Sequence, residues 1–163
     1  MIKADGHIFV LETAHTTYCF WRMETGHLEH LYYGRHLTLP EHPAERDVAP
    51  LMEKHTFAPG NTNLCDGEHP AFSLEDMRLE MSSYGKGDIR EPFVEIVHAD
   101  GSTTSDFRYE SYEITEKTVI GKIGPCGKVH MIWGWDEDEG GNEADIWSSD
   151  CYADWADAQR ALA

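Results

Sequence analysis

The chain has 163 residues, of which 40% are hydrophobic and 11% aromatic. This composition fits one globular domain with a sizeable core and argues against a disordered chain. Its 30 acidic residues against 13 Lys and Arg give a formal net charge of −17. Such a field repels phosphate backbones and anionic lipid, so we expect no nucleic-acid or membrane partner.

Compartment and redox state follow from what the sequence lacks. No apolar run approaches the roughly 20 residues that span a bilayer, and Met1 to His7 lacks the apolar core of a signal peptide. The cysteines are scattered and form no CxxC pair. We therefore predict a cytoplasmic protein with reduced thiols and without cysteine-ligated zinc. The cysteines are Cys19, Cys65, Cys126 and Cys151.

The first third of the chain is predicted to form consecutive strands. Residues 7–13 alternate in polarity, and residues 16–23 are rich in Thr, Tyr, Phe and Trp, which favour a pleated surface. Glu24-Thr25-Gly26 predicts a turn with glycine at positive φ. Residues 27–33 form the return strand, which Gly34 closes, so the pattern indicates a meander.

Residues 35–71 form a long connection in which regular structure should be sparse, because prolines recur among Asn, Gly and His. Such a connection inside a compact domain is uncommon, and it is usually functional or mobile. Loops also carry function more often than core strands do. We therefore expect a site, if there is one, in this segment.

The middle of the chain is also predicted to be β. The expected strands are residues 93–98, 106–115 and 118–123, and the expected turns are residues 84–88 and 99–102. Alternation places Phe93, Glu95 and Val97 on one face of their strand, and Tyr109 and Tyr112 on opposite faces of theirs. Helical periodicity is nearly absent before residue 125, so the fold class is mainly β.

Residues 125–163 differ from the rest of the chain in their sequence pattern. Residues 129–135 predict one more strand, and an acidic, glycine-ended loop follows at residues 136–141. Beyond it, apolar residues recur at spacings of four, four, three and four, which predicts one stripe of a short amphipathic C-terminal helix. The stripe consists of Trp147, Cys151, Trp155, Ala158 and Leu162.

The patterns that suggest ligand chemistry are weak. His27 and His30 have a metal-like spacing, but residues three apart on a strand face opposite sides. The acidic run at residues 136–139 lacks the oxygen spacing of a calcium loop, and Gly85-Lys86-Gly87 is too short to cradle phosphate. No Gly-x-Ser-x-Gly occurs. We predict no metal, no cofactor and no catalytic residue.

Aromatic side chains offer one weak route to sugar binding. Trp21, Tyr32 and Tyr33 could stack on a sugar ring if they were exposed. Core packing is the more common fate of such residues.

Six short motifs follow one another in order, and together they resemble the N-terminal domain of the family 36 α-galactosidases. The similarity stops near Gly124, and at Glu80 to Gly85 the Tyr-Pro of a family motif is missing. The motifs are Thr17-Tyr18, His30-Leu31-Tyr32-Tyr33-Gly34-Arg35, Phe72-Ser73-Leu74-Glu75, Tyr84-Gly85-Lys86-Gly87-Asp88-Ile89-Arg90-Glu91-Pro92, Asp100-Gly101-Ser102 and Phe107-Arg108-Tyr109.

The resemblance implies a supersandwich-like, antiparallel β-sandwich that precedes a (β/α)8 barrel carrying the catalytic aspartates. Family members cleave terminal α-galactosyl residues of melibiose and raffinose-type sugars. In tetrameric members, a loop of this domain helps bind sugar in a neighbouring subunit. Glu53 stands where the family has an acidic residue of that loop, so the resemblance implies a substrate-binding role for it. The arginine that the family uses further along is not matched, because Pro70 and its neighbours stand there.

We therefore expect residues 1–124 to form a partial N-terminal β-sandwich domain and residues 125–163 to form a tail of uncertain structure. The working hypothesis is a chain that is truncated or frameshifted after about Gly124 and that has no catalytic residues of its own. In the parent enzyme it would serve packing, homo-oligomerisation and a loop contribution to the α-galactoside site. Two alternatives stay open: a free-standing carbohydrate-binding module that uses exposed aromatics, and a small acidic hydrolase.

Overall fold

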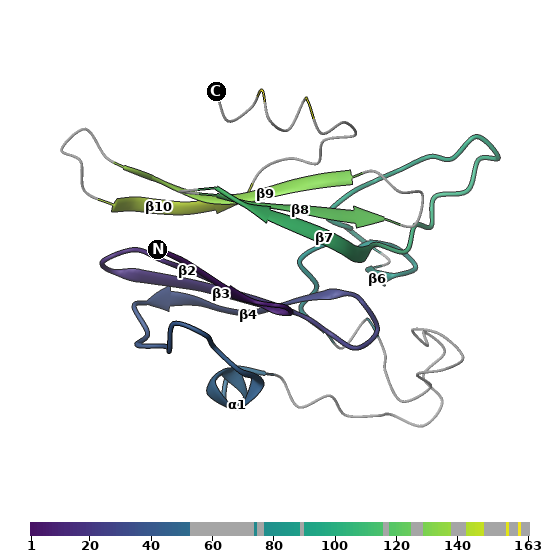
Figure 1. Cartoon of the computed structure of the whole chain (residues 1–163). Coiled ribbons are helices and arrows are strands. Elements are labelled where there is room, and N and C mark those ends of the chain that lie inside the picture. The colour runs from purple at the N-terminus through teal and green to yellow at the C-terminus, as the bar shows by residue number, and fades with distance from the viewer. Residues whose placement is uncertain are drawn as a thin grey trace.

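The chain folds into two antiparallel four-stranded sheets that face each other as two layers (Figure 1). The computed structural model describes residues 1–52, 74, 77–88, 90–115, 118–124, 129–137, 143–148, 156 and 160. The predicted mainly β, antiparallel class is confirmed. None of the helices in these described parts has the length and apolar character of a membrane span.

The first sheet is a meander in which each strand pairs with the next. Its strands are β1 (Ile2–Asp5), β2 (Ile8–Glu12), β3 (Thr16–Arg22) and β4 (Leu28–Arg35). Gly26 has a φ of 86° in the β3–β4 turn, as predicted. Gly34 does not close β4 but pairs inside it with Thr17, so the predicted strand end is too early.

The second sheet has the order β10-β9-β8-β7. Its strands are β7 (Arg108–Ile114), β8 (Thr118–Gly124), β9 (Val129–Glu137) and β10 (Glu143–Ser148). Trp147 lies in β10 and pairs with Gly134 in β9, so the prediction that a helical stripe begins at Trp147 is wrong. Ala156 and Arg160, which are not members of that stripe, are helical, and the remaining stripe residues Cys151, Trp155, Ala158 and Leu162 lie outside the described residues.

Three short elements complete the fold. The helix α1 (Glu45–Val48) lies on the outer side of the first sheet (Figure 1). The strands β5 (Ser83–Tyr84) and β6 (Gly87–Asp88) pair across the predicted turn, where Gly85 and Gly87 have φ of 72° and 96°.

The segment at residues 93–98, predicted to be a strand, is not one: Phe93 lies at a bend, and the segment pairs with no strand in the described part of the chain. Its side chains alternate as predicted, with Phe93, Glu95 and Val97 exposed. The predicted turn at residues 99–102 is present, with Gly101 at a φ of 84°.

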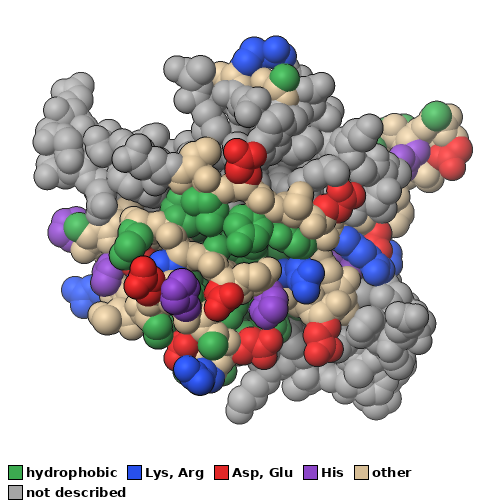
Figure 2. Space-filling model, in the orientation of Figure 1, with side chains coloured by type: hydrophobic (Ala, Val, Ile, Leu, Met, Phe, Trp, Pro, Cys, Tyr) green, Lys and Arg blue, Asp and Glu red, His purple; other side chains and the backbone are tan. Residues whose placement is uncertain are grey.

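The main core lies between the two sheets. The rings of Phe9 and Phe20 stack at 4.8 Å, and Tyr112 meets Phe9 edge-on at 5.0 Å. Tyr109 packs on the same cluster, because a register shift in β7 between Tyr109 and Ser111 reverses the alternation. The prediction that Tyr109 and Tyr112 face opposite sides is therefore wrong. Figure 2 shows hydrophobic side chains gathered between the layers, with charged ones over the lower layer.

A second core lies on the outer face of the first sheet, under α1. Buried side chains of β2, β3 and β4 contact Val48 of α1 there. At the same face the ammonium of Lys3 contacts the Glu12 carboxylate at 2.8 Å and donates to the carbonyl of Leu39 at 2.8 Å. This contact fixes the chain between β4 and α1 against the sheet.

Candidate functional site

The long connection predicted to carry a site is described only up to Met52, so Glu53 lies outside the described residues. The chain that leads to it is packed onto the protein. Val48 is fully buried, and Leu51 and Met52 pack on the same outer cluster of the first sheet. The N–H groups of Leu51 and Met52 donate to the carbonyls of Val48 and Ala49, which extends the turn of α1 to this point.

The chain returns from residues 53–73 to the same sheet. Leu74 and Met77 are buried against Met23. Arg78 to Glu80 then run along the free edge of β4: the His30 N–H donates to the Arg78 carbonyl at 2.7 Å, and the Glu80 N–H donates to the Leu28 carbonyl at 2.9 Å.

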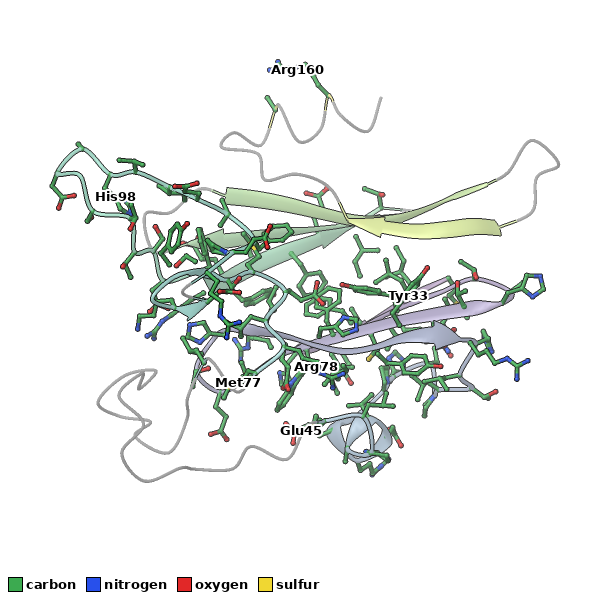
Figure 3. The ribbon with its side chains drawn as sticks, turned by 180° about the vertical axis from the view of Figure 1, so that it is seen from behind. Tyr33, Glu45, Met77, Arg78, His98 and Arg160 are labelled. Carbon is green, nitrogen blue, oxygen red and sulfur yellow. The ribbon has the colours of Figure 1, made fainter. Side chains whose placement is uncertain are left out.

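One contact joins the outgoing and the returning chain. The Arg78 guanidinium donates from Nη2 to the carbonyl of Leu51 at 3.4 Å. Figure 3 shows Met77 and Arg78 on the same side of the first sheet as Glu45 of α1. Both ends of the 53–73 stretch are therefore held close together beside β4.

A buried carboxylate secures the returning chain from the other face of the sheet. The side chain of Glu80 is 3% exposed, and it accepts hydrogen bonds from the Tyr18 hydroxyl at 2.7 and 2.8 Å. Nδ1 of His30 lies 3.0 Å from the same carboxylate. Glycoside hydrolysis uses two carboxyl groups across a pocket, whereas these contacts bind one carboxylate to two neighbouring strands. We infer that Glu80 positions the chain.

The three aromatic candidates for sugar stacking have different surroundings. Trp21 packs in the outer core and donates from Nε1 to the Glu29 carboxylate at 2.6 Å. Tyr32 packs there too, and its hydroxyl donates to the Arg35 carbonyl. Tyr33 is 52% exposed and lies between the two sheets in Figure 3. Only Tyr33, among these three, offers a ring to a ligand.

A second polar cluster links the two layers, and no local pattern predicts it because its partners are 79 residues apart. Nε2 of His27 lies 2.7 Å from Asp106, and Nδ1 lies 3.0 Å from the Thr25 hydroxyl. Arg108 donates from Nε to the other oxygen of Asp106 at 2.9 Å. Burial disfavours the charged carboxylate, but the His27 and Arg108 contacts outweigh it and lower the pKa of Asp106 to about 2.

The Thr25–His27–Asp106 order resembles a nucleophile, base and orienting acid, but it has no access for a substrate. Thr25 is 3% exposed and His27 is 2% exposed. The cluster therefore fastens the β3–β4 turn to the start of β7. His27 and His30, weighed above as a metal pair, contact two different carboxylates. Within the described ranges no three His, Cys, Asp or Glu side chains are grouped for a metal ion.

A shallow hollow of about 350 Å³ lies between the β1–β2 turn and α1. Its floor is apolar and its rim is charged. It is lined by Asp5, His7, Ile8, Pro43, Ala44, Glu45 and Arg46.

These features define a two-layered antiparallel β-sandwich domain with one long connection anchored on its first sheet. Residues 26–127 match the glycosyl hydrolase family 36 N-terminal domain. The chain belongs to this family, which confirms the resemblance seen in the sequence motifs.

Three curated relatives are α-galactosidases. The chain is 34% identical over 107 residues to the bifunctional alpha-galactosidase/sucrose kinase AgaSK of Mediterraneibacter gnavus, which covers 66% of this chain and 11% of that protein. It is 31% identical over 116 residues to the probable alpha-galactosidase G of Aspergillus terreus, covering 69% and 13%. It is 29% identical over 111 residues to the alpha-galactosidase AgaA of Geobacillus stearothermophilus, covering 65% and 13%. The chain thus spans between 11% and 13% of the length of these relatives.

Solved structures support the fold. The family 36 α-galactosidase AgaB of Geobacillus stearothermophilus superposes with a TM-score of 0.64 at 18% identity, over 83% of this chain and 20% of that one. The α-galactosidase of Lactobacillus brevis gives 0.62 at 20% identity, over 82% and 20%.

Proposed function

We propose that this chain is the non-catalytic N-terminal β-sandwich of a cytoplasmic α-galactosidase whose substrates are terminal α-galactosides such as melibiose and raffinose. It packs against the catalytic portion, supports homo-oligomerisation and contributes a loop to the sugar site. The three curated relatives named above are α-galactosidases, and the family match is to their N-terminal domain. Among them, doubly substituted variants of AgaA of Geobacillus stearothermophilus have been solved with raffinose and with stachyose.

The anchored ends of the 53–73 stretch carry the proposal. A binding loop works best when a rigid scaffold fixes both of its ends. Here Met52 and Leu74 are packed on one sheet, and Arg78 joins the two ends through the Leu51 carbonyl. Glu53 is the first residue beyond this anchor, so its carboxylate is our candidate for accepting sugar hydroxyl groups.

The purified chain tests the non-catalytic role directly. We expect no hydrolysis of p-nitrophenyl α-galactoside and no change in tryptophan fluorescence on titration with raffinose. Turnover by the pure chain would refute the proposal.

The second candidate function, a free-standing carbohydrate-binding module, is favoured by the 52% exposure of Tyr33. It predicts saturable raffinose binding by the chain alone, which Tyr33→Ala should abolish. Tyr32→Ala, which alters a packed aromatic, is the matched control.

The role of Glu53 requires a catalytic portion. A chimaera of AgaA from Geobacillus stearothermophilus that carries residues 26–127 of this chain would supply one. Glu53→Ala should raise KM for raffinose about tenfold, equivalent to about 1.4 kcal/mol, and leave kcat nearly unchanged. Glu45→Ala, an exposed acid on α1, should change neither value. Equal effects of both substitutions would contradict a sugar contact at Glu53, and sedimentation of the chimaera would report the oligomeric state.

A further inference from the structure

Residues 90–107 form an arm between β6 and β7 that projects past the ends of the sheets (Figure 1). His98 marks its outer part in Figure 3. The arm is attached firmly at its base, because Val94 and Ile96 pack against the main core. The opposite side of the same extended segment faces solvent.

That outer side carries two large apolar side chains. Phe93 is 48% exposed and Val97 is 68% exposed, which makes them two of the five most exposed large hydrophobic residues of the described chain. On an extended backbone, residues four apart are separated by about 13 Å. The arm thus presents two apolar anchors at strand spacing with the exposed Glu95 between them.

The alternating exposure of residues 93–97 has the two-residue period of an extended chain, and the backbone between the two anchors is unpaired. Its two ends are fixed: the Val94 N–H donates to the Ser82 carbonyl at 3.3 Å, and the His98 N–H donates to the Ser102 carbonyl at 2.8 Å. Between them, the N–H groups of residues 95–97 donate to no group in the described chain. An extended segment with free backbone groups is a template for an added strand.

The charge of Glu95 and of the whole chain determines which kind of strand can pair with residues 93–97. An antiparallel pair of two identical arms that sets Phe93 against Val97 also sets Glu95 directly against Glu95, and like charges opposite each other destabilise a sheet. Each copy of the chain also carries a net charge of −17, which opposes association of two copies. Glu91 and Asp100, also exposed, add to the negative charge of the arm.

We propose that the 93–97 edge of this arm is a docking site for an extended segment of another polypeptide. This segment places a Lys or Arg opposite Glu95 and apolar side chains opposite Phe93 and Val97. The backbone groups supply affinity, and the ion pair and the two apolar contacts supply register and selectivity. The proposal is independent of the sugar-binding role above, since it involves a different part of the domain.

The probe is a heptapeptide of the sequence acetyl-Thr-Val-Thr-Lys-Thr-Val-Thr-amide, titrated into the isotopically labelled full chain and followed by amide NMR shifts. We expect shifts centred on residues 93–98. Glu95→Lys should weaken binding at least tenfold, and it should permit binding of the same peptide with Glu at its centre. Glu91→Lys changes the net charge equally outside the anchor triplet and should keep most of the affinity.

Three outcomes would overturn the proposal. The first is the absence of shifts in residues 93–98 with the Lys peptide. The second is equal loss of binding in Glu95→Lys and Glu91→Lys, which would indicate unspecific attraction to a negative protein. The third is dimerisation of the wild-type chain in sedimentation that Val97→Thr abolishes, which would identify a second copy as the occupant.

Discussion

Removing the charge of Lys3, which is buried on the outer face of the first sheet, should be among the most destabilising single substitutions in that sheet. The side chains of Lys3 and Glu12 are 8% and 4% exposed, and the ammonium lies 2.8 Å and 2.9 Å from the two carboxylate oxygens. Lys3→Met keeps the length of the side chain but leaves the Glu12 carboxylate buried without its counter-ion. Breaking a buried pair in this way costs about 3–5 kcal/mol.

This loss is large compared with the whole stability of a domain, which is about 5–15 kcal/mol. Part of it, about 1 kcal/mol, comes from the Leu39 carbonyl, which loses its donor. The double substitution Lys3→Met with Glu12→Leu removes both charges, and apolar replacement of a buried pair is often neutral or stabilising by about 1–4 kcal/mol. We therefore expect the double variant to be more stable than the single one.

The assay is urea unfolding at pH 7, followed by tryptophan fluorescence, with the free energy of unfolding taken at constant m. Arg46→Met is the control: the Arg46 side chain is 86% exposed and lies 3.8 Å from Asp47, so the cost should stay below about 1 kcal/mol. The reasoning fails if Lys3→Met also costs less than 1 kcal/mol, or if the double variant is as unstable as the sum of its two single substitutions.

Three further substitutions or reagents test other parts of the fold. The pKa of Asp106 is lowered from 3.8 to about 2, so its contribution to stability is present above pH 3.8 and is lost as the pH falls towards 2. Asp106→Asn should remove this pH dependence and lower the free energy of unfolding by about 1–2 kcal/mol at pH 7, allowing for partial exposure. An unchanged fall in the free energy of unfolding between pH 4 and pH 2 in the variant would contradict this prediction. Gly87→Ala should destabilise the protein more than Gly101→Ala does in thermal unfolding. Both glycines have positive φ, but a Cβ at Gly87 would collide with the Leu79 side chain, whereas no atom lies within 4 Å of a Cβ at Gly101. We expect a loss of about 1–3 kcal/mol at Gly87 and about 1 kcal/mol at Gly101, and equal losses would show that the collision is relieved. Burial and the nearby carboxylates of Glu80 and Glu12 raise the pKa of the Cys19 thiol to about 12. After treatment with iodoacetamide at pH 8, peptide mapping should therefore find Cys19 unmodified in the native chain and modified in urea. Rapid modification of Cys19 in the native chain would show that the thiol is not buried.

The part of the fold that the sequence predicts correctly depends on local patterns. The β3–β4 hairpin is an example: aromatic and β-branched runs flank a glycine that the turn places at positive φ. The sequence pattern does not predict strand β1, because a lysine such as Lys3 normally lies at the surface. In the structure, Lys3 is buried and forms an ion pair with Glu12. Local pattern cannot show a pairing partner of that kind.

The errors have similar causes. The inward position of Tyr112 depends on the register shift after Tyr109, and a single extra residue reverses every later side chain. Trp147 fits a helical spacing, but pairing with Gly134 in β9 overrides that spacing. For the candidate site, the anchors at Glu80 and Asp106 join residues 62 and 79 positions apart, which one sequence cannot reveal. The role of Glu53 stays a prediction.

The order of the strands has a consequence for the folding kinetics. Both sheets are consecutive meanders, β1 to β4 and β7 to β10, so each large sheet is built from neighbouring strands in the sequence. Hairpins of this kind close within about 1–10 μs. The slow step should be the docking of the two finished meanders, in which Phe9 meets Tyr112 and His27 meets Asp106. Substitutions at these two contacts should therefore change the folding rate more than substitutions within either hairpin do.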